Sequence, residues 1–493
     1  MPSLCHALDR CTMRLPVKNL RNPVILSFIR KIDYASAFDK AVNTCKSASG
    51  AYVYSRPMKT THPHASLVYL GLLVFFGCMA IHAAEFPHAR HVILVSFDGL
   101  GGIQLNSYLQ TSPENFPNFR RLLREGSGTL NARCDYYAST TVQNHTSMLL
   151  GRPLERPEGW PPDSYHGYYN NGETTGETYH QHGNTNAGYL HSVWDVVHDH
   201  GLRTACIVSK SKLLICANSY DALYGAADRV GEDNGPNKVD YVQYIPWSYS
   251  LRCWGTLGAI TNFLQDDAPH FAFFHFADLD YLGHSFGWSS ATYSNALMAI
   301  DSCLGQLLDF IQAHPVMSNQ TSLIVTADHG GGVPDYSHTD PQYVLNYTIP
   351  FIVWGPGWPA GKNLYRVCSN RFDPETYRPD YLAPLQPIRT GDAANLALAI
   401  LRLPPVPGAP LQMVAGEPSL PLSMTRFAGG IVIRWPAPAG GYRLETADRL
   451  GDSGAWIPVT DGIIMDDVDW QKLLVIPTPM NAPMQWFRLR GEP

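Results

Sequence analysis

The chain has 493 residues, of which 45% are hydrophobic and 16% are charged, and its formal net charge is −6. This length is sufficient for two domains with a large core, and the composition excludes an intrinsically disordered, collagen-like or small disulfide-rich protein. The charge provides no basic surface, so we do not expect the protein to bind a nucleic-acid duplex.

The long apolar run at residues 65–84 predicts a secretory signal peptide whose translation start is Met58. Two alternatives stay open, a lipid anchor at Cys78 and a retained transmembrane helix. We therefore interpret residues 58–84 as a signal peptide or anchor. The protein is expected to be periplasmic or extracellular and to contact a membrane only through this segment.

Residues 1–57 show no sustained amphipathic period, and we interpret them as the product of a misassigned start site or, alternatively, as a disordered tail. Without residues 1–84 the mature chain is more acidic, which suits a secreted enzyme. Its six Cys include no CxxC pair, which argues against a Cys-based zinc site. Cys206 and Cys216 form the nearest pair, and the disulfide connectivity stays open.

From His91 onward, apolar strands alternate with helices, and the helix expected at 293–311 has apolar residues at spacings of three and four. This alternation predicts a mostly parallel sheet covered by helices on both faces, over residues 85–413. The predicted strands are 91–97, 202–209, 271–277, 322–327 and 349–355, and the other predicted helices are 116–126, 191–201 and 392–401.

After about residue 414 the pattern changes to short strand-like runs separated by turn residues. These runs predict a small β-sandwich-like domain over residues 414–493, joined through the Pro-rich stretch 404–421. Its tryptophans could form a carbohydrate-binding face, but packing in the core is the favoured interpretation. They are Trp435, Trp456, Trp470 and Trp486.

The segment Glu155–Tyr189 is rich in Gly, Tyr, His and Asn. It is too long for a simple connection and too polar for a core. We interpret it either as a surface insertion or as a loop that contacts the substrate, because long loops in α/β enzymes often line the active site.

Carboxylate and imidazole side chains follow three of the predicted strands, at the end where doubly wound sheets bind ligands. Each alone would be interpreted as a helix cap or a hydrogen-bonded loop residue, but together they are typical of a metal centre. Three Asp and three His suit two zinc-type ions with three protein ligands each. Two such ions can stabilise the attacking and leaving oxygens of a phosphoryl displacement. The six residues are Asp98, Asp280, His284, Asp328, His329 and His338.

A nucleophile is expected in the hydroxyl cluster at 139–141, which precedes an apolar helix. A Thr or Ser at a helix N-terminus beside a metal ion would be activated by coordination and by the local dipole. The alternative is that these hydroxyl groups only cap the helix.

Four segments in this order, FDG (97–99), TTVQNHTSM (140–148), DYLGH (280–284) and ADHGG (327–331), resemble the type I phosphodiesterase/nucleotide pyrophosphatase branch of the alkaline phosphatase superfamily. The resemblance extends from about His91 to Gly408. It implies an alkaline-phosphatase-like α/β fold, two Zn²⁺ ions (with other divalent metals as an alternative) and hydrolysis of a phosphodiester bond in a small phosphorylated substrate.

The resemblance also implies a role for each matching residue. Thr141 matches the nucleophile, which approaches a zinc ion, forms a phosphothreonine intermediate and is freed by a zinc-bound water. Asn144 matches a residue that helps to hold the phosphoryl oxygen. The ligands of one zinc ion are Asp98, Asp328 and His329, and those of the other are Asp280, His284 and, as the candidate for the last position, His338.

The chain departs from the family at the nucleophile, where Thr-Phe-Pro-Asn-His is replaced by Thr141-Val142-Gln143-Asn144-His145. Loss of the Pro leaves a choice between Thr140 and Thr141, and the spacing to Asn144 favours Thr141. His145 is expected to pack or to hydrogen-bond locally. His338 also follows the DHG triplet more closely than in the nucleotide pyrophosphatases.

Two other functions were weighed against the phosphodiesterase. The first is a phosphomonoesterase of the same superfamily, which would share the metal centre. The second is a non-catalytic secreted binding protein, which the complete ligand set argues against. A sulfatase is excluded because Cys134 lacks the signature that its modified nucleophile requires, and the leader argues against a cytoplasmic phosphoglycerate mutase. The sequence leaves the natural substrate and the oligomeric state open.

Overall fold

A computed structural model describes residues 84–493 except 231–234, 428, 449–455, 467–468, 478–484 and 492–493. The predicted extension at 1–57 and the predicted leader, apart from Ala84, lie outside the described residues. The assignments made for these two segments, and the exact domain boundaries, therefore stay predictions.

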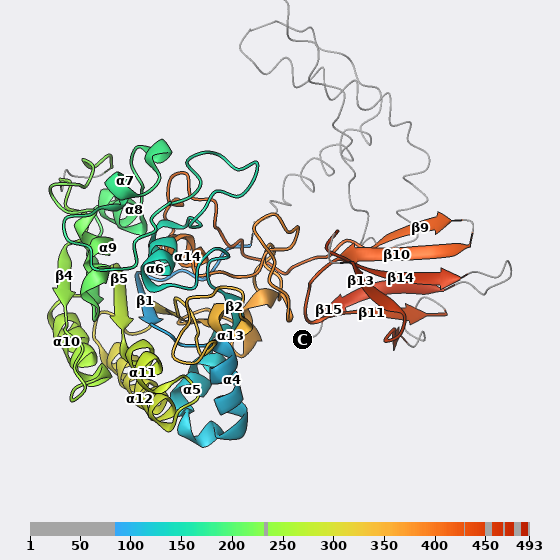
Figure 1. Ribbon diagram of the computed structural model, residues 1–493, viewed down its shortest axis with the longest axis horizontal. Helices are drawn as coiled ribbons and strands as arrows, with labels where there is room; N and C mark the ends of the chain where they lie inside the picture. The colour runs from blue at the N-terminus through green and yellow to red at the C-terminus, as the bar shows by residue number, and fades with distance from the viewer. Residues whose placement is uncertain are drawn as a thin grey trace, which may run out of the picture. The chain divides into compact units, whose positions relative to one another are not determined.

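The core of the α/β part is an eight-stranded sheet in the order β4-β3-β5-β1-β6-β7-β2-β8 (Figure 1). β1 pairs in parallel with β5 and β6, whereas β7 runs antiparallel to both of its neighbours. Every residue of β1 and β5 is buried, as expected for central strands covered on both faces. The strands are β1 His91–Phe97, β2 Ser127–Arg133, β3 Thr204–Val208, β4 Tyr241–Tyr244, β5 Phe271–Phe276, β6 Thr321–Thr326, β7 Thr348–Trp354 and β8 Lys362–Asn363.

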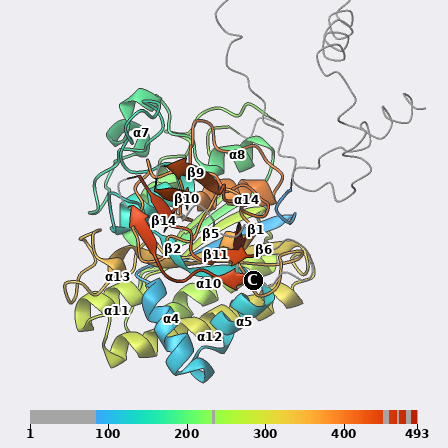
Figure 2. The same ribbon diagram turned by 90° about the vertical axis from the view of Figure 1, so that its right-hand side faces the viewer.

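Helices cover both faces of this sheet, with α6, α8 and α14 on one side and α4, α5, α10 and α12 on the other (Figures 1 and 2). This arrangement confirms the predicted mostly parallel α/β class. The longer helices are α4 Gly102–Thr111, α5 Pro117–Glu125, α6 Thr141–Leu150, α8 Val193–Asp199, α10 Cys253–Asp266, α11 Asp278–Phe286, α12 Ala291–Ala313 and α14 Asp392–Ile400.

Short helical segments lie in the connections. They are η1 Pro113–Asn115, α7 Tyr179–His182, η2 Thr185–Ala187, η3 Ser211–Leu214, α9 Ile215–Asn218, α13 Val344–Tyr347 and η4 Leu364–Arg366.

Helix α12 buries the apolar stripe that its spacing predicted. Among the described helices it alone is long and apolar enough to cross a membrane, and more than half of its apolar window is buried inside the protein. Burying each large apolar side chain stabilises the fold by about 2 kcal/mol. This burial inside the protein is typical of a core helix. The buried stripe is Tyr293, Leu297, Ile300, Leu304, Leu307 and Ile311.

The C-terminal part is all antiparallel β, as predicted. It contains a four-stranded sheet, β13-β14-β10-β9, and a three-stranded sheet, β12-β11-β15. Trp435 is buried in a small core with Ile433, Leu444 and Leu474, whereas Trp486 is 37% exposed. The strands are β9 Ser423–Phe427, β10 Gly430–Pro436, β11 Tyr442–Ala447, β12 Ile457–Pro458, β13 Ile463–Asp466, β14 Gln471–Pro477 and β15 Trp486–Gly491.

The six cysteines of the described chain are all buried, free thiols. Cys216, of the pair nearest in sequence, lies 3.1 Å from the Tyr179 hydroxyl. The fold instead brings together Cys253 of α10 and Cys303 of α12, whose Sγ atoms are 2.8 Å apart.

Candidate active site and metal centre

The predicted ligands meet because three neighbouring strands end at the same edge of the sheet. Asp98 follows β1, Asp280 lies in the first turn of α11 after β5, and Asp328 follows β6. Gly99 lets the end of β1 approach α11, since its φ is +78° and a Cβ there would lie 3.0 Å from Asp280 Cα. The parallel order β5-β1-β6 therefore places three carboxylates side by side.

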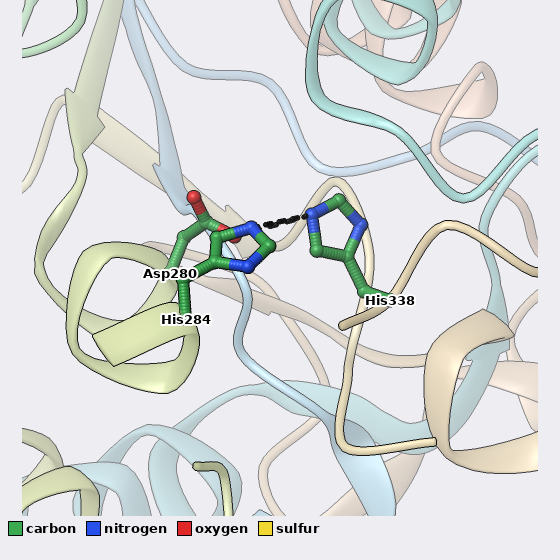
Figure 3. Close-up of side chains that lie close together, drawn as sticks. All are labelled: Asp280, His284 and His338. Atoms are coloured by element: carbon green, nitrogen blue, oxygen red, sulfur yellow. Dashed lines mark hydrogen bonds and ion pairs between the residues drawn. The ribbon is translucent and has the colours of Figure 1, made fainter. Parts of the chain in front are cut away.

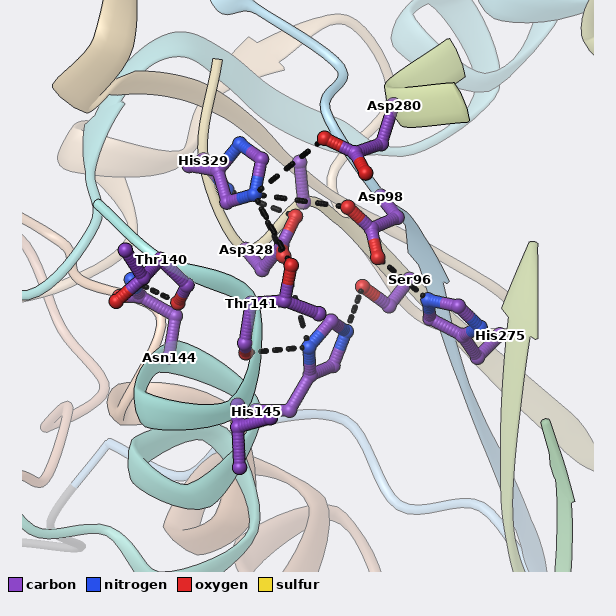
Figure 4. Close-up of polar contacts among 12 residues, drawn as sticks. Ser96, Asp98, Thr140, Thr141, Asn144, His145, His275, Asp280, Asp328 and His329 are labelled. Atoms are coloured by element: carbon purple, nitrogen blue, oxygen red, sulfur yellow. Dashed lines mark hydrogen bonds and ion pairs between the residues drawn. The ribbon is translucent and has the colours of Figure 1, made fainter. Parts of the chain in front are cut away.

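One group of candidate ligands consists of Asp98, Asp328 and His329, all buried, with one ligand atom of each within 4.8 Å of the others. His329 Nε2 lies 3.1 Å from Asp328 Oδ2 and 3.5 Å from Asp98 Oδ1 (Figure 4). The ring donates from Nδ1 to the carbonyl oxygen of Gly330 at 2.8 Å, which fixes its orientation and leaves Nε2 facing the carboxylates.

The second group consists of Asp280, His284 and His338 (Figure 3). His284 donates from Nδ1 to the Tyr336 carbonyl oxygen at 2.7 Å, and His338 donates from Nδ1 to that of Ser139 at 2.5 Å. The two Nε2 atoms lie 3.1 Å apart, and 3.3 and 3.4 Å from Asp280 Oδ1. A neutral imidazole that donates from Nδ1 carries a lone pair on Nε2, so these three atoms are arranged as ligands of one cation.

Three carboxylate oxygens in these groups lack a hydrogen-bond donor. Asp98 Oδ1, Asp280 Oδ1 and Asp328 Oδ2 are buried and accept no hydrogen bond from any residue that the structure describes. An unpaired buried polar atom destabilises a fold by about 1–3 kcal/mol, and a charged one by more. All three lie within 4.0 Å of His329 Nε2, so the residues fit a pair of adjacent metal ions.

Burial and mutual charge shift the pKa values of these groups. Burial and the neighbouring Asp98 hold the pKa of Asp328 well above its usual range. At Asp98, burial opposes ionisation, but Lys210 and His275 together outweigh it and lower the pKa of that carboxyl. Burial lowers the pKa of His329 and of His338. Two of the imidazoles are thus kept neutral, which is the form that binds a metal ion.

The predicted nucleophile, Thr141, is the first residue of α6 and is buried. Its Oγ1 lies 3.5 Å from His329 Nε2, between the helix and the carboxylates (Figure 4). The neighbouring Thr140 instead donates its hydroxyl to Gln143 Oε1 at 2.6 Å. Of the two candidate hydroxyl groups, that of Thr141 therefore faces the metal ligands.

Asn144 has a different environment from the one its predicted role requires. Its Oδ1 accepts from the backbone nitrogen of Asp135 at 2.7 Å, and its Nδ2 donates to the carbonyl oxygens of Ala138 and Thr140 at 3.0 Å. The side chain thus fastens the loop before Thr141 to the helix. In this arrangement it acts on the nucleophile through the backbone.

His145 hydrogen-bonds locally, as the sequence analysis expected. It donates from Nδ1 to the Thr141 carbonyl oxygen and accepts from the Ser96 hydroxyl at Nε2, both at 2.8 Å. Burial lowers the pKa of His145 to about 3, so the ring stays neutral. It therefore supports the nucleophile from the core side.

Lys210 and His275 belong to the site although the sequence analysis did not select them. Lys210 follows β3, and its Nζ lies 2.7 Å from Asp98 Oδ2 and 2.5 Å from Asp280 Oδ2. His275 of β5 donates from Nε2 to Asp98 Oδ2 at 3.0 Å. Their signals were a charged residue at a strand end and a single polar residue in the apolar strand FAFFHF.

The insertion at 155–189 contacts the nucleophile helix. Asn171 Oδ1 accepts from the backbone nitrogen of Val142 at 3.0 Å, and the Tyr169 carbonyl oxygen accepts from Gln143 Nε2 at 2.6 Å. Of its two interpretations, these contacts favour a loop at the active site.

A further, partly buried cluster has the residue types of a metal site. It consists of His198, Asp199 and Asp228, at the end of α8 and in the loop before β4. Lys238 bonds both carboxylates, lying 2.6 Å from Asp199 Oδ1, and also the Gly235 carbonyl oxygen at 3.3 Å. This lysine uses the oxygen atoms that a metal ion would need.

Fold and site together define a hydrolase of phosphoric esters. Residues 92–346 match the family model for type I phosphodiesterase/nucleotide pyrophosphatase, and the chain belongs to this family. The resemblance stated from the sequence is thereby confirmed. Metal dependence is typical of this family.

Individual relatives are distant. Ectonucleotide pyrophosphatase/phosphodiesterase family member 3 of Mus musculus is 26% identical over 251 residues, which are 48% of this chain and 24% of that protein. The match thus spans about a quarter of the curated relative.

Solved structures with similar folds include a protein in the alkaline phosphatase superfamily from Vibrio parahaemolyticus. It has 14% identity and a TM-score of 0.41, covering 77% of this chain and 84% of that one. Murine ectonucleotide pyrophosphatase/phosphodiesterase 5 in complex with AMP has 14% identity and a TM-score of 0.41, covering 64% and 96%.

Proposed function

We propose that the protein is an exported, two-metal hydrolase that cleaves a phosphoester bond of a small phosphorylated substrate through a phosphothreonine on Thr141. One observation carries this proposal. Three buried carboxylate oxygens, which accept no hydrogen bond from the described residues, and three imidazole nitrogens face one another beside the Thr141 hydroxyl.

Asp98, Asp328 and His329 would hold one metal ion, and Asp280, His284 and His338 the other; a set of imidazole and carboxylate ligands suits Zn²⁺. When bound, such a pair of cations supplies charge stabilisation for the attacking and leaving oxygens.

The chain itself positions the nucleophile. Thr141 Oγ1 would lose its proton to solvent and form a bond to phosphorus while the bond to the leaving oxygen breaks. Water would then hydrolyse the phosphothreonine, which releases phosphate from a monoester substrate or a phosphate monoester from a diester. The N-terminus of α6 favours the negative charge that develops there. Asn144 and His145 hold the backbone of this turn, so that Thr141 is placed before the substrate arrives.

The first experiment compares Thr141→Ala with the matched variant Thr140→Ala. Hydrolysis of p-nitrophenyl phosphate and bis-p-nitrophenyl phosphate is measured with zinc and with chelator. We expect zinc-dependent turnover that Thr141→Ala abolishes and Thr140→Ala retains. Acid quenching followed by peptide mass spectrometry should find the phosphoryl group on Thr141. Full activity of Thr141→Ala would overturn the proposal, and loss in Thr140→Ala alone would move the nucleophile to Thr140.

Export is proposed from the apolar run before Glu85. N-terminal sequencing of the protein produced from Met58 in a secreting host should give a chain that begins near Glu85. Retention of the whole run in the membrane fraction would support the anchor instead.

A further inference from the structure

Two lysines on one short segment lie beside the predicted metal centre. Lys210 ends the turn after β3, and Lys212 lies in η3, two residues further on. Lys210 is nearly fully buried, at 4% exposure, and bonds one oxygen each of Asp98 and Asp280. Lys212 is half-buried, and its Nζ lies 3.3 Å from the Asn171 carbonyl oxygen.

The second lysine is connected to the nucleophile through the insertion. Asn171, which Lys212 contacts, accepts the backbone hydrogen of Val142, the residue directly after Thr141. Thr174 donates to the Lys212 carbonyl oxygen at 3.3 Å. The insertion therefore holds the lysine segment against the N-terminus of α6.

The charges at the centre show why two ammonium groups matter there. Three carboxylates, those of Asp98, Asp280 and Asp328, belong to the two sets of ligands that fit divalent cations. The positive charge of two dications already exceeds the negative charge of three carboxylates. Two further buried or half-buried ammonium groups then leave an excess of positive charge, which a substrate must balance because charges are costly in a poorly solvated site.

Phosphate esters differ in the charge that they can provide. The phosphoryl group of a monoester has a second pKa near 6 and carries close to two negative charges at neutral pH. A diester carries a single negative charge. It also lacks the third free oxygen that an additional ammonium group could bind.

We propose that Lys210 and Lys212 bind the free oxygens of a terminal phosphoryl group, so that the site prefers phosphate monoesters to diesters. This inference rests on the proposed function and specifies its substrate class. The insertion takes part by fixing Lys212 through Asn171.

Selectivity is tested by the ratio of kcat/KM for p-nitrophenyl phosphate to that for bis-p-nitrophenyl phosphate. The purified full chain is compared with Lys210→Met and Lys212→Met. Lys362→Met is the matched control, because this exposed lysine on β8 lies outside the site. We expect the wild type to prefer the monoester, and each site variant to lower the ratio about ten- to a hundredfold, as for a lost charge-assisted hydrogen bond. Lys362→Met should leave the ratio unchanged.

Binding provides a readout that does not depend on turnover. Calorimetry of the zinc-loaded proteins with inorganic phosphate and with dimethyl phosphate compares a ligand that can bind as a dianion with one that is always a monoanion. The wild type should bind phosphate more tightly, and Lys212→Met should lose most of this difference. Metal content, measured for every variant, separates loss of phosphate binding from loss of zinc, which matters most for Lys210.

The outcomes distinguish this inference from the proposed function. If the wild type cleaves neither ester, the proposed function fails, and a lysine-dependent preference for phosphate over dimethyl phosphate would still support the binding site. If Lys210→Met and Lys212→Met keep their zinc and the wild-type ratios of hydrolysis and binding, the lysines only neutralise carboxylates and the inference is wrong. A wild type that prefers the diester in both assays also overturns it.

Discussion

The protein buries carboxylate, imidazole and lysine side chains together in two places. At the ends of β1, β5 and β6, Lys210 contacts Asp98 and Asp280, while three carboxylate oxygens accept no hydrogen bond from the described part of the chain. In the cluster around Lys238, the ammonium group contacts Asp199, Asp228 and a backbone carbonyl, and His198 lies 3.4 Å from Asp228. Both clusters have the residue types of a metal site.

The two clusters differ in whether hydrogen-bond donors of the protein satisfy the lone pairs of the carboxylate and imidazole groups. In the metal centre, imidazole Nε2 atoms and carboxylate oxygens face one another, and backbone carbonyls accept the hydrogens on the opposite nitrogens. Around Lys238, the ammonium group donates to the carboxylates, which forms a closed ion-pair network. Composition alone therefore does not mark a metal site, whereas unsatisfied, converging lone pairs do.

The largest expected effect separates the clusters by the same substitution in each. Asp328→Asn removes a ligand charge and should lower kcat/KM at least about a hundredfold, with loss of bound zinc, since even weaker perturbations of metal sites have such effects. Asp228→Asn should leave the zinc content and the activity of the folded protein unchanged. Both are measured by hydrolysis assays and by elemental analysis. Equal loss of zinc from the two variants would contradict the distinction between the two clusters.

Removal of Lys238 should affect stability and not catalysis. Lys238→Met leaves Asp199 and Asp228 without their cation and should lower the free energy of unfolding by about 3 kcal/mol. Urea denaturation measures this change, and Lys362→Met is the control for loss of an exposed lysine. An unchanged unfolding midpoint in Lys238→Met would show that the second cluster is not a structural ion-pair network.

Chelation should affect only the metal centre. A bound ion at a hundred times its Kd stabilises the native state by about 2.7 kcal/mol, so chelator should lower the melting temperature by several degrees. The same shift is expected for Asp228→Asn but not for Asp328→Asn. Calorimetry with and without chelator checks this, and a shift that survives in Asp328→Asn would place the ion elsewhere.

The smallest expected effect is a loss of stability at low pH, caused by a buried imidazole outside both clusters. His166 accepts from the Tyr168 backbone nitrogen and donates to the Ser147 hydroxyl, and burial, assisted by Arg152, lowers its pKa to about 3. The folded protein therefore keeps this ring neutral, while the unfolded chain protonates it below about pH 6.5. Its contribution to stability is present above that pH and is lost as the pH falls toward 3.

The free energy of unfolding should thus fall by up to about 1.4 kcal/mol per pH unit through this group. His166→Gln should be less stable at pH 7.5 but should have a shallower acid dependence. Urea denaturation at several pH values compares the two slopes. Equal slopes would mean that His166 is not held neutral in the folded state.

Local patterns predicted the elements that build the metal centre. Central strands such as β1 and β5 are continuous apolar runs, and the polar residue that ends each run needs no tertiary information to be noticed. The N-cap of α8 is equally local, because Ser192 and Asp195 form a capping box within four residues.

Elements that depend on distant partners could not be predicted in this way. β2 reads SGTLNAR, which looks like a polar loop, yet its Arg133 is buried. The guanidinium donates to the carbonyl oxygens of Glu375 and Tyr377, more than 200 residues away. These distant partners, added to the local acceptors on Asn131 and Ala132, satisfy the buried guanidinium.

The role of Asn144 shows the same limit within the site. The family resemblance implied that Asn144 helps to hold the phosphoryl oxygen, and the structure shows its amide group bonded to Asp135 and Ala138 of the preceding loop. Lys210, by contrast, was not predicted as a residue of the site. A lysine at a strand end usually points to solvent, and nothing local in the sequence places it between two carboxylates.

Gly99 also connects the end of β1 to neighbouring elements of the site. Its carbonyl oxygen accepts from Trp288 Nε1 at 3.0 Å and from the Tyr293 hydroxyl at 2.9 Å. The end of β1 is therefore tied to α12 and to the turn after α11, the helix that carries Asp280 and His284. The separation of the two proposed ion sites is therefore constrained by main chain on the carboxylate side. On the other side, the His284 side chain is 41% exposed and is held by its hydrogen bond to the Tyr336 carbonyl oxygen. We expect exchange of zinc for an ion of another radius to be accommodated by the imidazoles, so the centre would select metals by ligand preference more than by size.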